Sequence, residues 1–131
     1  MSPADVASDR PLLDKLGVKP GMRVSVLGAF EDAFVSELRG RGVDVSHRRR
    51  VRTDLLFLRV PDGFDLAKLA SLEASMERDG AVWVVYPKGR KDIRETDVIH
   101  AGLDAGFVDN KIVRFSETHT AMRLVIPVAR R

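Results

Sequence analysis

The sequence contains no cysteine, so disulfide bonds, thiolate zinc sites and cysteine nucleophiles are all excluded. Aromatic residues are scarce, with a single tryptophan and a single tyrosine. No apolar run approaches the roughly 18 residues that a membrane-spanning helix needs. Residues 1–5 lack the basic-then-apolar order of a secretion signal. From these absences we expect a cytoplasmic protein that does not enter a membrane.

The remaining composition is that of a globular protein. Hydrophobic residues make up 44% and charged residues 31% of the chain, and 131 residues provide for one hydrophobic core. We expect a flexible tail over residues 1–9 and a single domain over residues 10–131. The net charge of +3 favours encounters with polyanions without defining a binding face.

Apolar spacing predicts alternating strands and helices. Ser8–Pro11 suggests the start of a short helix that Gly17 ends. The expected strands cover 22–28, 43–46, 54–60 and 81–86, the expected helices cover 31–39, 65–78 and 94–105, and two last strands cover 107–115 and 121–128.

This order predicts an α/β fold with a Rossmann-like, mostly parallel sheet of about six strands, helices on both faces and a C-terminal antiparallel hairpin. The strand at 81–86 is the most apolar and should lie in the centre, beside the strand at 54–60. Only residues 47–53 separate the second and third strands, which is too short for a helical crossover, so the sheet should lack one edge unit.

Four stretches resemble a small bacterial family of unknown function that has a truncated class I S-adenosylmethionine methyltransferase-like fold. They are LGVKPGMRV (16–24), DLLFL (54–58), GAVWVVYPK (80–88) and TAMRL (120–124). The resemblance extends over about residues 11–128. It implies a fold and brings no known activity with it.

Two features that such folds use to hold their cofactor are missing, and a third is weak. A Gly-x-Gly turn after the first strand lets the backbone approach the cofactor, but here Gly28 is followed by Ala29 and Phe30. An acid ending the second strand would bind the ribose, but the chain has Ser46-His47-Arg48 there. No cofactor is therefore expected, and S-adenosylmethionine enters only if the chain is an active methyltransferase with an atypical loop.

Residues at the carboxyl ends of the strands are the candidates for ligand binding, since open α/β sheets bind ligands there. They are Gly28, Phe30, Glu31, Asp32, Tyr86 and Lys88. Glu31 and Asp32 also suit a helix N-terminus, where they would repel a phosphate. No catalytic residue and no metal ligand is assigned, because His47, His100 and His119 are isolated in the sequence.

Four arginines are clustered between the second and third expected strands. Arg48, Arg49, Arg50 and Arg52 suggest either phosphate contacts to nucleic acid or a solvated loop. No aromatic residue lies within the run, as stacking on single-stranded nucleic acid would require. The solvated loop is the favoured interpretation, and it predicts that four serines in these positions would barely affect folding.

Three functions follow from these patterns. The preferred one is a non-catalytic or degenerate methyltransferase-like domain that binds a small ligand or a protein. The alternatives are an active methyltransferase and a basic protein that associates with nucleic acid. The expected partners are an unidentified small ligand or a protein, including a second copy of the chain, with nucleic-acid binding at most weak and non-specific.

Overall fold

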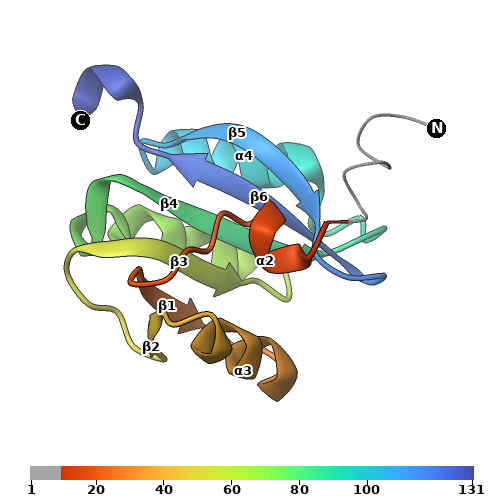
Figure 1. Ribbon diagram of the computed structural model, residues 1–131. Helices are drawn as coiled ribbons and strands as arrows, with labels where there is room; N and C mark the ends of the chain where they lie inside the picture. Colours follow the sequence, from red (N-terminus) through yellow and green to blue (C-terminus); the bar gives the residue numbers. More distant parts are fainter. Residues whose placement is uncertain (1–9) are drawn as a thin grey trace.

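The computed structural model describes residues 10–131, so the tail predicted over 1–9 lies outside the described residues. Helical segments and strands alternate along most of the chain (Figure 1). In order they are α2 (Leu12–Lys15), β1 (Arg23–Leu27), α3 (Asp32–Gly40), β2 (Asp44–Ser46), β3 (Thr53–Arg59), η1 (Gly63–Ser71), η2 (Glu73–Ser75), β4 (Met76–Pro87), α4 (Glu95–Asp104), β5 (Val108–Arg114), β6 (His119–Val125) and η3 (Val128–Arg130).

The strands form one six-stranded sheet in the order β2-β1-β3-β4-β6-β5. The first four strands are parallel, and β6 is antiparallel to both of its neighbours, β4 and β5. Strand β4 lies beside β3, and its residues 81–86 are buried. The predicted sheet, its closing hairpin and its central strand are confirmed. Within residues 10–131, no helix is long and apolar enough to cross a bilayer.

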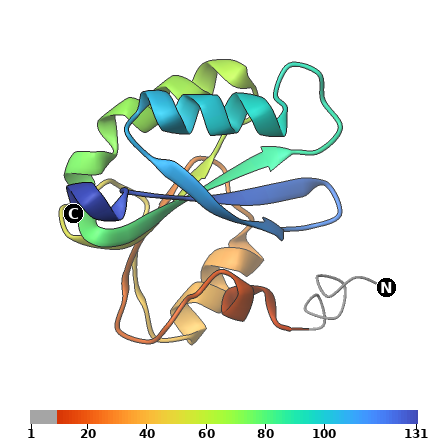
Figure 2. The same ribbon diagram turned by 90° about the horizontal axis from the view of Figure 1, so that it is seen from above.

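Side chains alternate between the two faces of the sheet, as the period of a strand requires. In β3, Leu55 and Phe57 face the core under α2 and α3, whereas Leu56 and Leu58 face the core under η1 and α4. We call these two sides the α3 face and the α4 face. Figure 2 shows the helical layers on opposite sides of the sheet, and the prediction of helices on both faces is confirmed.

The helix predicted over 65–78 is wrong in type and in extent. Two 3₁₀ segments, η1 and η2, cover residues 63–75, and β4 already begins at Met76. Leu66, Leu69 and Leu72 are all buried, and their spacing of three residues matches the three residues per turn of a 3₁₀ helix. Asp62 caps η1, because its carboxylate accepts hydrogen bonds from the backbone nitrogens of Phe64 and Asp65.

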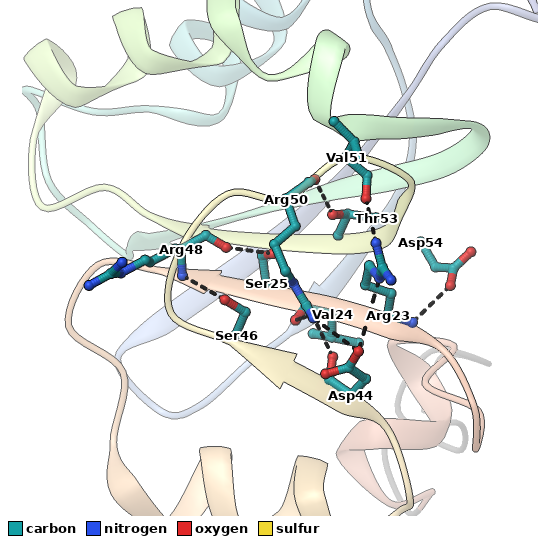
Figure 3. Close-up of polar contacts among 10 residues, drawn as sticks. All are labelled: Arg23, Val24, Ser25, Asp44, Ser46, Arg48, Arg50, Val51, Thr53 and Asp54. Atoms are coloured by element: carbon teal, nitrogen blue, oxygen red, sulfur yellow. Dashed lines mark hydrogen bonds and ion pairs between the residues drawn. The ribbon is translucent and has the colours of Figure 1, made fainter.

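An extended segment, residues 47–52, connects β2 to β3 and passes β1 on the α4 face (Figure 3). The Ser25 hydroxyl of β1 donates to the Arg48 carbonyl (3.0 Å), and the Arg49 guanidinium reaches Ser71 at the end of η1. Helix α3 makes the preceding connection on the opposite face. The two crossovers therefore run in opposite directions on opposite faces, which gives both the same hand.

Candidate functional site at the strand switch point

The strand order creates a switch point between β1 and β3. From β1 the chain continues outward to β2, whereas from β3 it continues to β4 on the other side. At such a point the loops that follow the two strands diverge and leave a crevice at their carboxyl ends. Gly28 follows β1 with a φ of 107°, and a Cβ placed there would lie 3.0 Å from the Cβ of Arg59 at the end of β3. The β1 loop and the end of β3 are therefore in close contact.

A pocket of about 330 Å³ opens beside this contact, on the α4 face. We call it the switch-point pocket. Its volume is at the lower end of the range for small-molecule sites. It is lined by Leu27, Gly28, Arg49, Leu58, Arg59, Lys68, Ser71 and Leu72, and none of these described residues is acidic.

Three positively charged residues line the switch-point pocket, and they differ in how their charges are balanced. Arg59 pairs with Glu31 at 2.9 Å, and Lys68 pairs with Asp65 at 3.3 Å. Arg49 pairs with no carboxylate of residues 10–131; its guanidinium donates to the hydroxyl and the carbonyl of Ser71, at 2.7 and 3.1 Å. Arg49 therefore brings an uncompensated positive charge to the pocket.

On the α3 face, Phe30 is part of an aromatic cluster. Its ring stacks on Phe34 with 5.4 Å between centroids and meets Phe57 and Phe115 edge to face at 6.3 and 6.1 Å. The Arg59 guanidinium lies 5.6 Å from the centre of the Phe30 ring, in a cation–π contact. Phe30 thus packs against the protein's own core, on the far side of the sheet from the switch-point pocket.

A polar network covers this aromatic cluster at the carboxyl edge of the sheet. Arg59 donates to both Glu31 oxygens, at 2.9 and 3.1 Å, and approaches Nε2 of His119 at 3.2 Å. Because a guanidinium only donates, Nε2 must be the acceptor, so the neutral ring carries its proton on Nδ1. Nδ1 lies 2.8 Å from the Thr118 hydroxyl and donates to it.

The surroundings of the network lower the pKa of both of its titratable groups, Glu31 and His119. Burial acts to raise the pKa of Glu31, but its backbone hydrogen bond, the Arg59 hydrogen bond and the charges of Arg59 and His119 together lower it. The pKa of His119 is lowered by burial first and then by the charges of Arg59 and Lys88, against the opposing effect of Glu31. At neutral pH Glu31 is therefore ionised and His119 is neutral, and in these protonation states both keep their hydrogen bonds to Arg59.

We expect stability to fall as the pH drops from 7.5 to 5.5, because the folded His119 resists protonation that the unfolded histidine accepts near pH 6.5. Because the pKa of His119 is lowered in the folded protein, His119 stabilises the fold at pH values above the pKa of the unfolded histidine. This stabilisation is lost as the pH falls below that pKa. Glu31 titrates only at lower pH. Urea unfolding at both pH values should show that His119→Gln loses less stability than the wild type between pH 7.5 and 5.5. The glutamine amide oxygen can still accept a hydrogen bond from Arg59. Equal losses in the two proteins would contradict the assignment.

The other predicted ligand residues lie apart from the switch-point pocket. Asp32 is exposed in the first turn of α3, where a negative charge stabilises the helix dipole. Tyr86 is buried on the α4 face, and burial, with a smaller contribution from Glu95, raises its pKa to about 12. Tyr86 and Lys88 line a separate pocket of about 460 Å³. Of the six predicted residues, only Gly28 lines the switch-point pocket.

The structure contradicts the solvated-loop interpretation for one of the four arginines, Arg50. Its side chain is only 26% exposed and bonds to Asp44 and to the Val24 carbonyl (Figure 3). Arg48, Arg49 and Arg52 are exposed, although Arg49 donates to Ser71. The run is therefore partly a structural element of the sheet edge, and its nucleic-acid role stays a prediction.

Sequence reasoning missed Arg59 and Lys68, and it treated His119 as isolated. The only sequence signal for Arg59 is its position as the charged last residue of an otherwise apolar strand. His119 lies 60 residues from Arg59, so no spacing rule connects them. Within the described residues, no three histidine or acidic side chains gather as a metal would require.

No protein-family model matches the sequence, and a search of curated proteins finds no match. Solved structures do match. A SAM-dependent methyltransferase from Aquifex aeolicus superposes with a TM-score of 0.66 and 15% identity, over 95% of this chain and 98% of that chain. A TehB-like SAM-dependent methyltransferase from Corynebacterium glutamicum gives 0.66 and 13%, over 92% and 91%.

A third similar structure is the 1,6-didemethyltoxoflavin-N1-methyltransferase of Burkholderia thailandensis, with bound S-adenosylhomocysteine. It superposes with a TM-score of 0.65 and 12% identity, over 93% of this chain and 76% of that chain. At these identities the likeness shows the fold alone. The chain has a class I methyltransferase-like fold, in a truncated form, as the sequence resemblance implied.

Proposed function

We propose that this protein is a non-catalytic methyltransferase-like module that binds a small anionic ligand in the switch-point pocket. The observation that carries the proposal is the lining of that pocket, which includes Arg49 and Lys68 and has no acidic residue among those described. The position is the one at which open α/β sheets bind ligands.

The charge of the pocket disfavours S-adenosylmethionine. That cofactor carries a sulfonium, an ammonium and a carboxylate group, so its net charge is positive. In such folds an acid at the end of the second strand binds its ribose hydroxyls. Strand β2 ends at Ser46, whose hydroxyl accepts from the backbone nitrogen of Arg48. The nearest carboxylate after β1, Glu31, is bound by Arg59. Neither position offers the cofactor a free acid.

The same charge favours an anion. Arg49 has no carboxylate partner among residues 10–131, and its guanidinium presents paired donors that suit a carboxylate or a phosphate. The Ser71 hydroxyl, which Arg49 already contacts, supplies a further polar group. Leu27, Leu58 and Leu72 provide the apolar wall that small-molecule sites require.

Calorimetry tests the proposal with two kinds of probe. S-adenosylmethionine and S-adenosylhomocysteine should give no binding in the micromolar range, whereas inorganic phosphate and citrate should bind, the larger anion more tightly. Arg49→Gln should weaken citrate binding about tenfold, which is about 1.4 kcal/mol. Lys91→Gln, which removes an exposed lysine that does not line the pocket, is the matched control.

Two results would overturn the proposal. Micromolar binding of S-adenosylmethionine, about −8 kcal/mol, would contradict the proposal and favour the alternative of an active methyltransferase with an atypical loop. Equal citrate binding by Arg49→Gln and Lys91→Gln would place the anion elsewhere. The nucleic-acid alternative has less support, because Arg50 is bound within the protein and no aromatic residue lies within the run for base stacking.

A further inference from the structure

A second pocket lies on the α3 face, at the amino end of the parallel strands and thus away from the switch point. Its volume is about 260 Å³. Asp54 of β3, Asp79 and Trp83 of β4, Arg123 of β6 and Lys111 of β5 line it, together with the end of α2. We call it the amino-edge pocket.

A row of three side chains forms the floor of the amino-edge pocket. Trp83 lies directly opposite Arg123 in the register of β4 and β6, and Arg123 lies directly opposite Lys111 in the register of β6 and β5. Two like charges in directly opposed positions destabilise a sheet. Burial lowers the pKa of Lys111, and the charges of Arg10 and Arg123 lower it further. Burial, and then the charge of Arg131, lowers the pKa of Arg123.

No carboxylate of residues 10–131 forms an ion pair with either member of this pair. The Arg123 guanidinium has no hydrogen bond or ion pair with any residue in the range 10–131, and within that range the Lys111 ammonium donates only to the Lys15 carbonyl, at 2.8 Å. Two of the three carboxylates in the pocket are already used. Asp14 pairs with Arg41, and Asp54 accepts from the backbone nitrogen of Arg23 at 2.8 Å.

The third carboxylate, Asp79, also has no partner in the described part of the chain, and no ion pair joins it to Arg123. The pocket therefore presents an unbalanced positive side and an unbalanced negative side that do not meet. A molecule that carries both charges would neutralise both sides at once. The volume has room for one amino acid, and Trp83 gives it an apolar wall.

We propose that the amino-edge pocket binds a small zwitterion of the amino-acid type, with its carboxylate on Arg123 and Lys111 and its ammonium on Asp79. This site is independent of the switch-point pocket. It lies at the other end of the strands and shares no lining residue with that pocket.

Trp83 is the only tryptophan in the chain and lines the pocket, so its fluorescence reports occupancy directly. Three probes separate the charges: L-alanine carries both, propionate carries only the anion, and ethylamine carries only the cation. Alanine should shift the emission saturably with a Kd of about 1 mM. Propionate should bind about tenfold more weakly, and ethylamine should leave the emission unchanged.

Arg123→Met removes the charge and keeps the aliphatic stem. It should abolish the alanine response, and the melting temperature of the ligand-free protein should stay equal or rise, because repulsion from Lys111 is relieved. Asp79→Asn should make alanine and propionate bind alike. Arg114→Met, which removes an exposed arginine of β5 that does not line the pocket, should bind alanine as the wild type does.

Three outcomes would overturn the inference. They are the absence of a saturable response to alanine, an unchanged response in Arg123→Met, and equal binding of alanine and propionate by the wild type. A lower melting temperature of Arg123→Met would likewise contradict it, because that would mean that Arg123 has a stabilising partner within the protein.

Discussion

Gly80→Ala is expected to destabilise the protein by about 3 kcal/mol, since overpacking of a tight site costs 1–3 kcal/mol or more. A Cβ on residue 80 would lie 2.8 Å from the carbonyl oxygen of Asp54, 3.0 Å from that of Thr53 and 3.1 Å from that of Glu77. All three are backbone atoms, so no side chain can rotate away. Relief would require the backbone to shift where the amino end of β3 meets β4.

Gly40→Ala is the matched control. Gly40 is the last residue of α3, and a Cβ there would have no heavy atom within 4 Å. Alanine at such a site stabilises a protein by about 0.4–1 kcal/mol, through the unfolded chain. Urea unfolding followed by circular dichroism compares the two variants. If Gly80→Ala were as stable as Gly40→Ala, the contact between β3 and β4 described for Gly80 would be wrong.

Arg50→Met is expected to cost about 3 kcal/mol, because hydrogen bonds to charged groups contribute about 1.5–3 kcal/mol and their loss leaves acceptors unpaired. The Arg50 guanidinium donates to the Asp44 carboxylate (2.9 Å), the Asp44 carbonyl (2.8 Å) and the Val24 carbonyl (3.1 Å). These bonds tie the short edge strand β2 to β1 (Figure 3). Only 26% of the Arg50 side chain is exposed, so water replaces these bonds poorly.

The comparison is with Arg52→Met, two residues further along the same segment. Arg52 is exposed, and its replacement should change the free energy of unfolding by no more than about 0.5 kcal/mol. Arg50→Lys should fall between the two, because an ammonium cannot donate in the planar fork of a guanidinium. Similar costs for Arg50→Met and Arg52→Met would restore the interpretation of residues 48–52 as a solvated loop.

The type of a helix or strand could be predicted where the spacing of apolar residues in the sequence agrees with their burial in the structure. Residues 81–86 form a continuous apolar run and lie buried in the centre of the sheet. The same reasoning failed for residues 63–80. The apolar residues of this segment fit both an α-helix and a 3₁₀ segment, and a glycine after them is typical of a helix end. Gly80 is required instead by close contact with the backbone of β3, which no local pattern reveals.

Only part of the candidate site could be predicted from the sequence, for a similar reason. Gly28 could be assigned to the switch point because the order of strands and helices fixes where β1 ends. Phe30 and Tyr86 also follow or end strands, yet both pack into the core. Position along a strand gives the edge of the sheet, whereas the face on which a side chain lies depends on the packing of neighbouring helices.

The sequence by itself determined the alternation of strands and helices, the missing edge unit and the loss of the Gly-x-Gly turn and of the acid after β2. These properties depend on neighbouring residues, so they can be read locally. Tertiary structure alone decided which charges meet. Arg59 reaches Glu31 across 28 residues and His119 across 60, while Arg123 and Lys111 oppose each other without a counterion among residues 10–131. Such contacts depend on strand order and register, because only folding brings residues so distant in sequence to within hydrogen-bonding distance.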